Sequence, residues 1–283
     1  MMKAFISRNV SSLLTSRALR NTRRALFALR RRLTGGTPTV HYFHQADDPY
    51  SHVAVQLLAP LRERYRIALK VWLVAPPDEA AAPEMELLRA YGRRDAARLA
   101  REYGLDFPEG AAAPDTILAA RCTALLAQAV RKKGFTEVAV AAGSALWAGN
   151  EPAMAALEKE HGAATARDTE RAVARGTAKR RKLGHYLSGM FRFEGEWYWG
   201  VDRLNYLEER LADAGLDRAA GTPMLAPWRD LELAPPPPSA HRPVIDYWFS
   251  FRSPYSWISV PRMRKLARHY NAELRLRFVS SMM

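Results

Sequence analysis

Cysteine is almost absent from this sequence: Cys122 is the single cysteine among 283 residues. Neither an intrachain disulfide nor a C-x-x-C redox pair can form, which excludes a dithiol oxidoreductase. Cys122 lies among apolar residues with helical spacing. We therefore expect a buried thiol with a packing role rather than a reactive one.

Long apolar runs are also missing. No window of about 18 or more apolar residues exists, so we expect no membrane-spanning helix. No uninterrupted apolar core of about 7–15 residues follows the basic N-terminus, which excludes a secretory signal. We expect a cytoplasmic protein, which would be membrane-peripheral or organellar if its N-terminal segment serves as an anchor or an address.

Acidic residues are missing from the first 46 positions, while residues 1–36 carry Lys3 and eight arginines. This segment holds nine of the fourteen net positive charges. Three interpretations stay open: binding to an anionic membrane surface, an Arg-rich targeting segment, or a loosely packed or disordered tail. Nucleic-acid binding is not expected, because no aromatic-basic platform or recognition motif accompanies the arginines. Between them, apolar residues fall near helical spacing up to Gly35-Gly36: Ile6, Val10, Leu13, Leu14, Leu26, Leu29 and Leu33.

The remaining chain is globular in composition, with 48% hydrophobic and 25% charged residues. Its clearest pattern lies at 244–279. An apolar run rich in β-branched and aromatic residues is typical of a strand buried on both faces. Ser253 and Pro254 then start a helix as N-cap and first position, and the alternation over 274–278 indicates a second strand. This strand-helix-strand unit predicts a parallel pair with a right-handed crossover.

The start of that helix is the candidate functional position. Free backbone N–H groups and the helix dipole favour an anion, a thiolate or an ionised hydroxyl there. Ser253 would either act on such a group or serve only as the helix cap.

Residues 40–74 repeat this unit. Shifted by 205 positions, they align without gaps on residues 245–279 with nine identities in 35, which indicates a duplicated domain. In the first copy Asp48 stands where Ser253 stands in the second. Aspartate is an equally good helix cap, but it cannot supply a hydroxyl to a thiol and would repel an anionic sulfur. The identical positions are Tyr42, Pro49, Tyr50, Ser51, Val55, Leu61, Tyr65, Leu69 and Val74.

The region between the two copies supplies the remaining helices and strands of the first domain. Residues 83–182 have helical composition and period. Residues 188–202 predict a β-hairpin with a tight turn at Gly195, and residues 201–214 predict a final helix.

Two segments, DYWFSFRSPYSW and FEGEWYWGVDRLNYLEERL, resemble the DsbA-like thioredoxin superfamily. The resemblance is to the branch of 2-hydroxychromene-2-carboxylate isomerases and kappa-class glutathione transferases, over roughly residues 38–214 and 243–283. It implies an α/β protein: a thioredoxin-like fold with a helical insertion, followed by a partial second thioredoxin-like copy. It also implies glutathione as the cofactor, and we expect no metal.

The resemblance assigns roles to individual positions. Ser253, followed by Tyr255, matches the serine that interacts with the glutathione sulfur. Asp202 matches an acidic residue that contacts the γ-glutamyl end of glutathione, unless it only caps the final helix. In the first copy the degenerate equivalents are Asp48 and Gly189, which takes the place of a cis-proline.

These observations divide the chain into four parts. Residues 1–36 are the basic segment, 37–215 the first thioredoxin-like domain, 216–242 a Pro-rich linker and 243–283 the start of the second domain. About 40 residues bury too little surface to fold alone. We expect this part to pack on the first domain, to associate with another chain, or to continue in a longer protein.

Two functions follow as hypotheses. The first is a glutathione-dependent isomerase or transferase that uses Ser253 on a small electrophilic aromatic substrate, provided that the second domain is complete. The alternative is a catalytically silent thioredoxin-like binding or scaffold protein, or an oxidoreductase relative without the C-x-x-C pair. The residue before Pro-Tyr-Ser, serine in one copy and aspartate in the other, distinguishes the copies.

Overall fold

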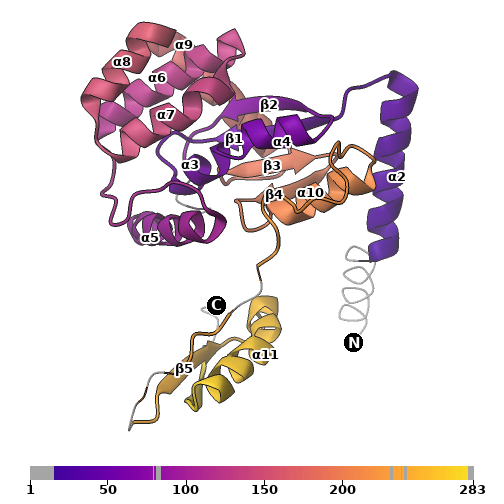
Figure 1. The fold of residues 1–283 in the computed structure, drawn as a ribbon, viewed down its shortest axis with the longest axis vertical. Coiled ribbons are helices and arrows are strands. Elements are labelled where there is room, and N and C mark those ends of the chain that lie inside the picture. The colour runs from indigo at the N-terminus through magenta and orange to yellow at the C-terminus, as the bar shows by residue number, and fades with distance from the viewer. Residues whose placement is uncertain are drawn as a thin grey trace. The chain divides into compact units, whose positions relative to one another are not determined.

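The computed structural model describes residues 16–78, 80, 84–229, 232–236, 238 and 241–279. The chain divides into two units, Met1–Trp228 and Arg229–Met283 (Figure 1). Each unit is described by itself below.

The first unit is built on a four-stranded sheet in the order β2-β1-β3-β4. β1 and β2 are parallel, whereas β1–β3 and β3–β4 are antiparallel. This arrangement of a strand-helix-strand unit followed by a hairpin confirms the thioredoxin-like fold expected from the sequence. The strands are β1 (Thr39–His44), β2 (Ala68–Leu73), β3 (Met190–Phe193) and β4 (Glu196–Trp199).

In the part of the chain that the structure describes, five helices lie between β2 and β3, as the composition of that region predicts. Of these, α6 to α9 lie together as a helical layer (Figure 1), and α6 and α9 pack against β2. Gly176 lets α9 approach the backbone of β2 closely, because a Cβ there would lie 1.9 Å from the Leu73 carbonyl oxygen. The helices of this unit are α2 (Arg17–Thr34), α3 (Pro49–Val55), α4 (Leu58–Arg64), α5 (Met85–Tyr103), α6 (Thr116–Lys132), α7 (Phe135–Trp147), α8 (Glu151–His161), α9 (Ala166–Lys182) and α10 (Leu204–Asp213).

The first unit continues past residue 215, where the sequence placed its boundary. Arg64 forms an ion pair with Asp217 at 3.1 Å. The buried carboxylate of Glu208 accepts the amides of Leu225 and Ala226, both at 2.9 Å. Residues up to 226 are therefore anchored on α4 and α10 instead of starting the linker.

The second unit contains β5 (Val244–Phe249), α11 (Pro254–His269) and β6 (Glu273–Phe278), with β5 and β6 parallel. The expectation that β5 is buried on both faces is wrong for this unit. Only Phe249 is buried along the strand, and Trp248 is 66% exposed. Aromatic content predicted the strand correctly, but a two-stranded sheet with one helix is too small to cover both faces.

The basic N-terminal segment is partly described. Its leucines at 26, 29 and 33 lie on α2, which ends at the predicted glycines with Gly35 in the left-handed conformation (φ 60°). The apolar positions Ile6, Val10, Leu13 and Leu14 lie outside the described residues. Among the helices that the structure describes, none has the length and apolar character needed to cross a bilayer.

Candidate functional site

The two strand-helix junctions share one geometry. Each opens with a buried or half-buried tyrosine, whose hydroxyl donates to a carbonyl at the start of the helix. Each also has a polar cap that accepts the amide of the serine in Pro-Tyr-Ser. Three contacts recur at the offset of 205 found in the sequence. The tyrosine hydroxyl donates to a helix carbonyl in both junctions, from Tyr42 to Ser51 O (2.8 Å) and from Tyr247 to Ser256 O (2.6 Å). The serine Oγ accepts a loop amide in both, from Gln45 N to Ser51 Oγ (3.3 Å) and from Ser250 N to Ser256 Oγ (3.2 Å), and the strand register recurs as Thr39–Ala68 and Val244–Glu273.

In the first unit, Asp48 closes the helix N-terminus. Its Oδ2 accepts the Ser51 amide at 2.9 Å and the Ser51 hydroxyl at 2.7 Å. Desolvation by burial raises the pKa of Asp48, and hydrogen bonds from Ser51 and Ser188 oppose this shift. The prediction that Asp48 caps α3 is confirmed.

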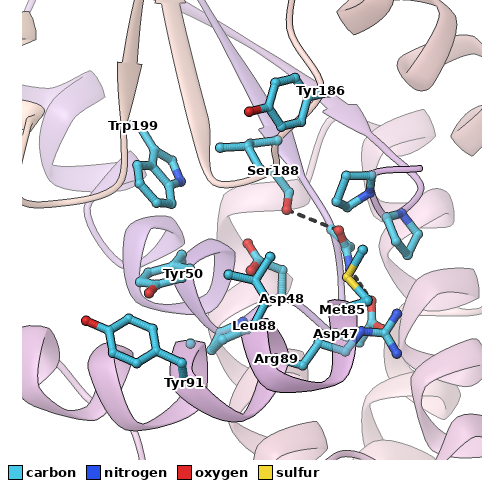
Figure 2. A pocket seen from close by; sticks show the side chains of 16 residues that line it. Asp47, Asp48, Tyr50, Met85, Leu88, Arg89, Tyr91, Tyr186, Ser188 and Trp199 are labelled. Atoms are coloured by element: carbon cyan, nitrogen blue, oxygen red, sulfur yellow. Dashed lines mark hydrogen bonds between the residues drawn. The ribbon is translucent and has the colours of Figure 1, made fainter. Parts of the chain in front are cut away.

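A cavity of about 490 Å³ opens beside Asp48 (Figure 2). Carboxylates from the β1–α3 loop and the Ser188 hydroxyl supply polar groups, and the Ser188 hydroxyl donates to the Gln45 side chain at 3.1 Å. Four aromatic side chains and several aliphatic ones form much of the remaining wall. The lining residues are Gln45, Asp47, Asp48, Pro49, Tyr50, Pro76, Pro77, Met85, Leu88, Arg89, Tyr91, Gly92, Tyr186, Leu187, Ser188 and Trp199.

Tyr50 joins three elements at this cavity. Its ring meets Trp199 of β4 edge to face at 5.5 Å between centroids, and its hydroxyl donates to Asp95 of α5 at 2.8 Å. Burial and the neighbouring Asp95 carboxylate raise the pKa of Tyr50 above its ordinary value. The phenol therefore stays protonated and holds α5 over the cavity.

Gly189 lies directly against the start of α3. Its amide donates to Phe43 O at 2.9 Å, and its carbonyl accepts the Gly200 amide at 3.0 Å. Its φ is +64°, and a Cβ there would lie 3.3 Å from the Ser51 nitrogen. The sequence match predicted that Gly189 lies beside the start of this helix, and the structure has it there.

Asp202 does not line the cavity. Its Oδ2 accepts from Arg203 Nη1 at 2.5 Å, and Arg203, rather than Asp202, precedes α10 as the N-cap residue. The reading of Asp202 as a helix cap is therefore wrong. Desolvation raises the pKa of Asp202, and the Arg203 charge opposes that shift.

Ser253 and Tyr255 belong to the second unit. The Ser253 hydroxyl oxygen accepts the Ser256 amide at 3.4 Å, which confirms the predicted cap, and Tyr255 is 82% exposed. Asp202, the third residue assigned to glutathione, lies in the first unit. No single unit therefore holds all three.

The residues of the first unit do not fit glutathione used as a thiolate. The Asp48 carboxyl occupies the helix N-terminus, and an ionised carboxylate there would repel an anionic sulfur. No cluster of three or more metal-ligating side chains occurs within the described ranges.

Sequence reasoning missed most of the cavity wall. Tyr91 and Leu88 of α5, and Tyr186 and Ser188 before β3, come from segments that the sequence only identified as helical or as leading into the hairpin. The sequence contained only an indirect indication of these residues, namely aromatic side chains near the ends of predicted helices and strands. Only the tertiary arrangement of α5 and the hairpin brings them to Asp48.

No family model matches the chain, and no curated protein matches it. Among solved structures, it is similar to a 2-hydroxychromene-2-carboxylate isomerase, with 20% identity, a TM-score of 0.44, and coverage of 62% of this chain and 95% of that one. It is also similar to a cytosolic disulfide reductase DsbM from Pseudomonas aeruginosa with GSH. The identity is 17%, the TM-score is 0.43, and the match covers 62% of this chain and 97% of that one. A third similar structure is that of a putative protein disulfide isomerase from Nitrosomonas europaea. The identity is 14%, the TM-score is 0.45, and the match covers 62% of this chain and 97% of that one. At these identities and TM-scores the similarity says nothing of activity.

Proposed function

We propose that the first unit is a thioredoxin-like binding domain that takes a small aromatic molecule and carries out no thiol chemistry. One observation carries this proposal: the Asp48 carboxyl closes the N-terminus of α3 beside a cavity that is otherwise largely aromatic and apolar. Ligand sites are commonly apolar cavities with a few convergent polar groups.

The chemistry of the polar groups suggests what they would do. Asp48 Oδ2 already accepts the Ser51 amide and hydroxyl, so its other carboxylate oxygen would accept a hydrogen bond from a ligand hydroxyl or N–H group. Ser188 adds a hydroxyl to the cavity lining. It donates to the Gln45 side chain (Figure 2), so toward a ligand it would accept a hydrogen bond. A planar ligand with one polar edge would match this distribution, with its rings against Tyr50 and Trp199.

The cavity can be blocked by a variant with a close control. Leu88 lines the cavity, whereas its neighbour Leu87 is 68% exposed and does not line it. In a thermal-shift screen of small aromatic acids and phenols, ligands should stabilise the wild type and Leu87→Trp but not Leu88→Trp. Equal stabilisation of all three proteins, or of none, would contradict the proposal.

A second candidate is glutathione binding at Ser253 in the second unit. It is favoured by the repeated junction geometry, with a half-exposed hydroxyl in place of the carboxylate at the start of α11. There Ser253 would donate a hydrogen bond to the glutathione sulfur, and the helix N-terminus would stabilise the thiolate. The reaction would be isomerisation or conjugation of an electrophilic aromatic substrate.

Calorimetry with glutathione on the full chain tests this second candidate. Ser253→Ala should abolish the binding, and Ser253→Thr, which keeps a hydroxyl and a helix cap, should retain it. Binding that survives Ser253→Ala but is lost in Leu88→Trp would place glutathione in the first unit, which would overturn both candidates.

The shared offset also supports descent of the two junctions from one duplicated segment. Strand register, cap and tyrosine hydrogen bond all recur 205 positions apart. Under this proposal the first copy lost the serine chemistry, while the second kept it.

A further inference from the structure

Helix α2 is amphipathic, but its apolar side faces away from the protein instead of toward the core. Such helices normally turn their apolar stripe toward the core and their charges toward water. In α2 no residue is buried, and arginines form its hydrogen bonds and ion pairs with the rest of the first unit.

Arginines attach α2 to the β3–β4 hairpin. Arg24 donates to both carboxylate oxygens of Glu196, at 2.7 and 2.6 Å, and Arg31 forms an ion pair with Glu194. Phe27 lies over the turn, where a Cβ on Gly195 would come within 2.9 Å of its ring. These contacts fix which side of α2 faces the unit.

The opposite side of α2 is apolar and exposed. Leu26, Leu29 and Leu33 follow the i, i+3, i+7 spacing of one helix face, roughly opposite Arg24 and Arg31. Their side chains are 60%, 53% and 78% exposed. The apolar face of this helix therefore points away from the unit that holds it.

Exposed arginines border this face. At helical spacing Arg23 and Arg30 lie along one edge and Arg32 along the other, and all three are exposed. The helix contains no acidic residue. The outward surface is thus an apolar stripe between two basic edges.

We propose that this outward surface of α2 docks in the headgroup region of an anionic membrane. An anionic bilayer surface meets both parts of the pattern: leucines enter the acyl boundary, and arginines contact lipid phosphates and carboxylates. A second copy of the chain would cover the leucines but would bring the basic edges of two helices together. Nucleic acid would satisfy the arginines and leave the leucines in water.

The test is co-sedimentation of the full chain with phosphatidylcholine vesicles containing about 30% phosphatidylserine. The variant Leu26→Gln/Leu29→Gln/Leu33→Gln should bind at least tenfold more weakly than the wild type. Its matched control, Leu87→Gln/Ile117→Gln, removes exposed apolar side chains from α5 and α6 and should bind as the wild type does.

A second pair of variants separates this docking from general attraction to polyanions. Arg23→Gln/Arg30→Gln/Arg32→Gln should weaken binding about fivefold for each arginine removed. The control Arg94→Gln/Arg98→Gln/Arg167→Gln, which changes exposed arginines of α5 and α9, should bind as the wild type does. Pure phosphatidylcholine vesicles should bind the wild type weakly.

Three results would overturn the proposal. The first is unchanged vesicle binding by the leucine variant while the arginine variant loses it, since attraction to any polyanion would then suffice. The second is equal binding to vesicles with and without phosphatidylserine. The third is a dimer in light scattering that the leucine variant converts to a monomer without vesicles, since a second copy would then cover the face. Circular dichroism checks that each variant keeps the wild-type melting temperature.

Discussion

Ser51 donates both its amide and its hydroxyl hydrogen to one oxygen of Asp48, at 2.9 and 2.7 Å. This single oxygen satisfies a free amide of the first turn of α3 and a buried hydroxyl. The contact places a carboxyl at the start of α3, in the position that the Ser253 hydroxyl takes at the start of α11.

Removing that carboxyl should destabilise the first unit. Asp48→Ala leaves the Ser51 amide and hydroxyl without their acceptor and should lower the free energy of unfolding by about 1–2 kcal/mol. Asp48→Asn keeps an acceptor at the cap and should lie within about 0.5 kcal/mol of the wild type. Urea unfolding measures both, and an Ala variant as stable as the Asn variant would argue against a capping role.

Asp48→Ser gives the first junction the same residue before Pro-Tyr-Ser that the second junction has, Ser253. In the Ser253→Ala background, this change should create glutathione affinity in the first unit if the carboxylate charge alone excludes the thiolate. Asp48→Asn, which removes the charge without adding a hydroxyl, is the control. Absence of any heat with glutathione for Asp48→Ser would show that other cavity residues also exclude it.

Stability should fall as the solution becomes acidic. Burial lowers the pKa of His44 to about 3 and that of His52 to about 4, and both side chains are 2% exposed. In the unfolded chain both histidines are protonated near pH 6.5, whereas in the folded protein they stay neutral until the pH falls to their lowered pKa values. The histidine contribution to the free energy of unfolding is complete above about pH 6.5. Below that it is lost by up to about 1.4 kcal/mol per pH unit for each histidine, until pH reaches the folded pKa.

Urea midpoints at pH 7 and pH 5 measure this loss. His52→Leu should reduce the difference between the two midpoints, because one titrating group is gone. Val53→Ala, a core change on the same helix, should lower both midpoints equally. A His52→Leu variant with the wild-type pH dependence would show that His52 does not contribute.

Two glycines inside helices should respond to alanine in opposite directions. At Gly176 a Cβ would lie 1.9 Å from Leu73 O, so Gly176→Ala must push α9 off β2 and should cost about 3 kcal/mol or more. At Gly92 the nearest atom is 3.4 Å away, so Gly92→Ala should stabilise by about 0.5–1 kcal/mol through helix propensity. Thermal unfolding distinguishes the two, and similar shifts would contradict the close approach of α9.

Local chemistry predicted the elements well. Ser253-Pro254 and Asp48-Pro49 gave the starts of α11 and α3, and Gly195 gave the hairpin turn, because each depends on residues within a few positions. The sheet topology followed from the repeat and the hairpin. Burial of β5 was predicted wrongly, because burial depends on what packs against a strand and its own sequence cannot show this.

The candidate site was only partly predictable. Asp48 and Gly189 were placed from the repeat and from the hairpin match. Tyr91 and Trp199 reach the cavity only through the packing of α5 and β4 around Tyr50, which no short-range pattern contains. Asp202 does not line this cavity, and its side chain pairs with the neighbouring Arg203; its contact with glutathione stays a prediction.

The buried Cys122 makes a built-in reporter. Its side chain is fully covered between α6 and α7, its thiol lies 3.8 Å from the Ala142 carbonyl oxygen, and burial raises its pKa to about 12. Thiolates are the nucleophiles that react with peroxide and maleimide, so the buried thiol of the folded protein should react with neither. Since no other cysteine competes, the rate of labelling at Cys122 would measure how often the helical layer opens.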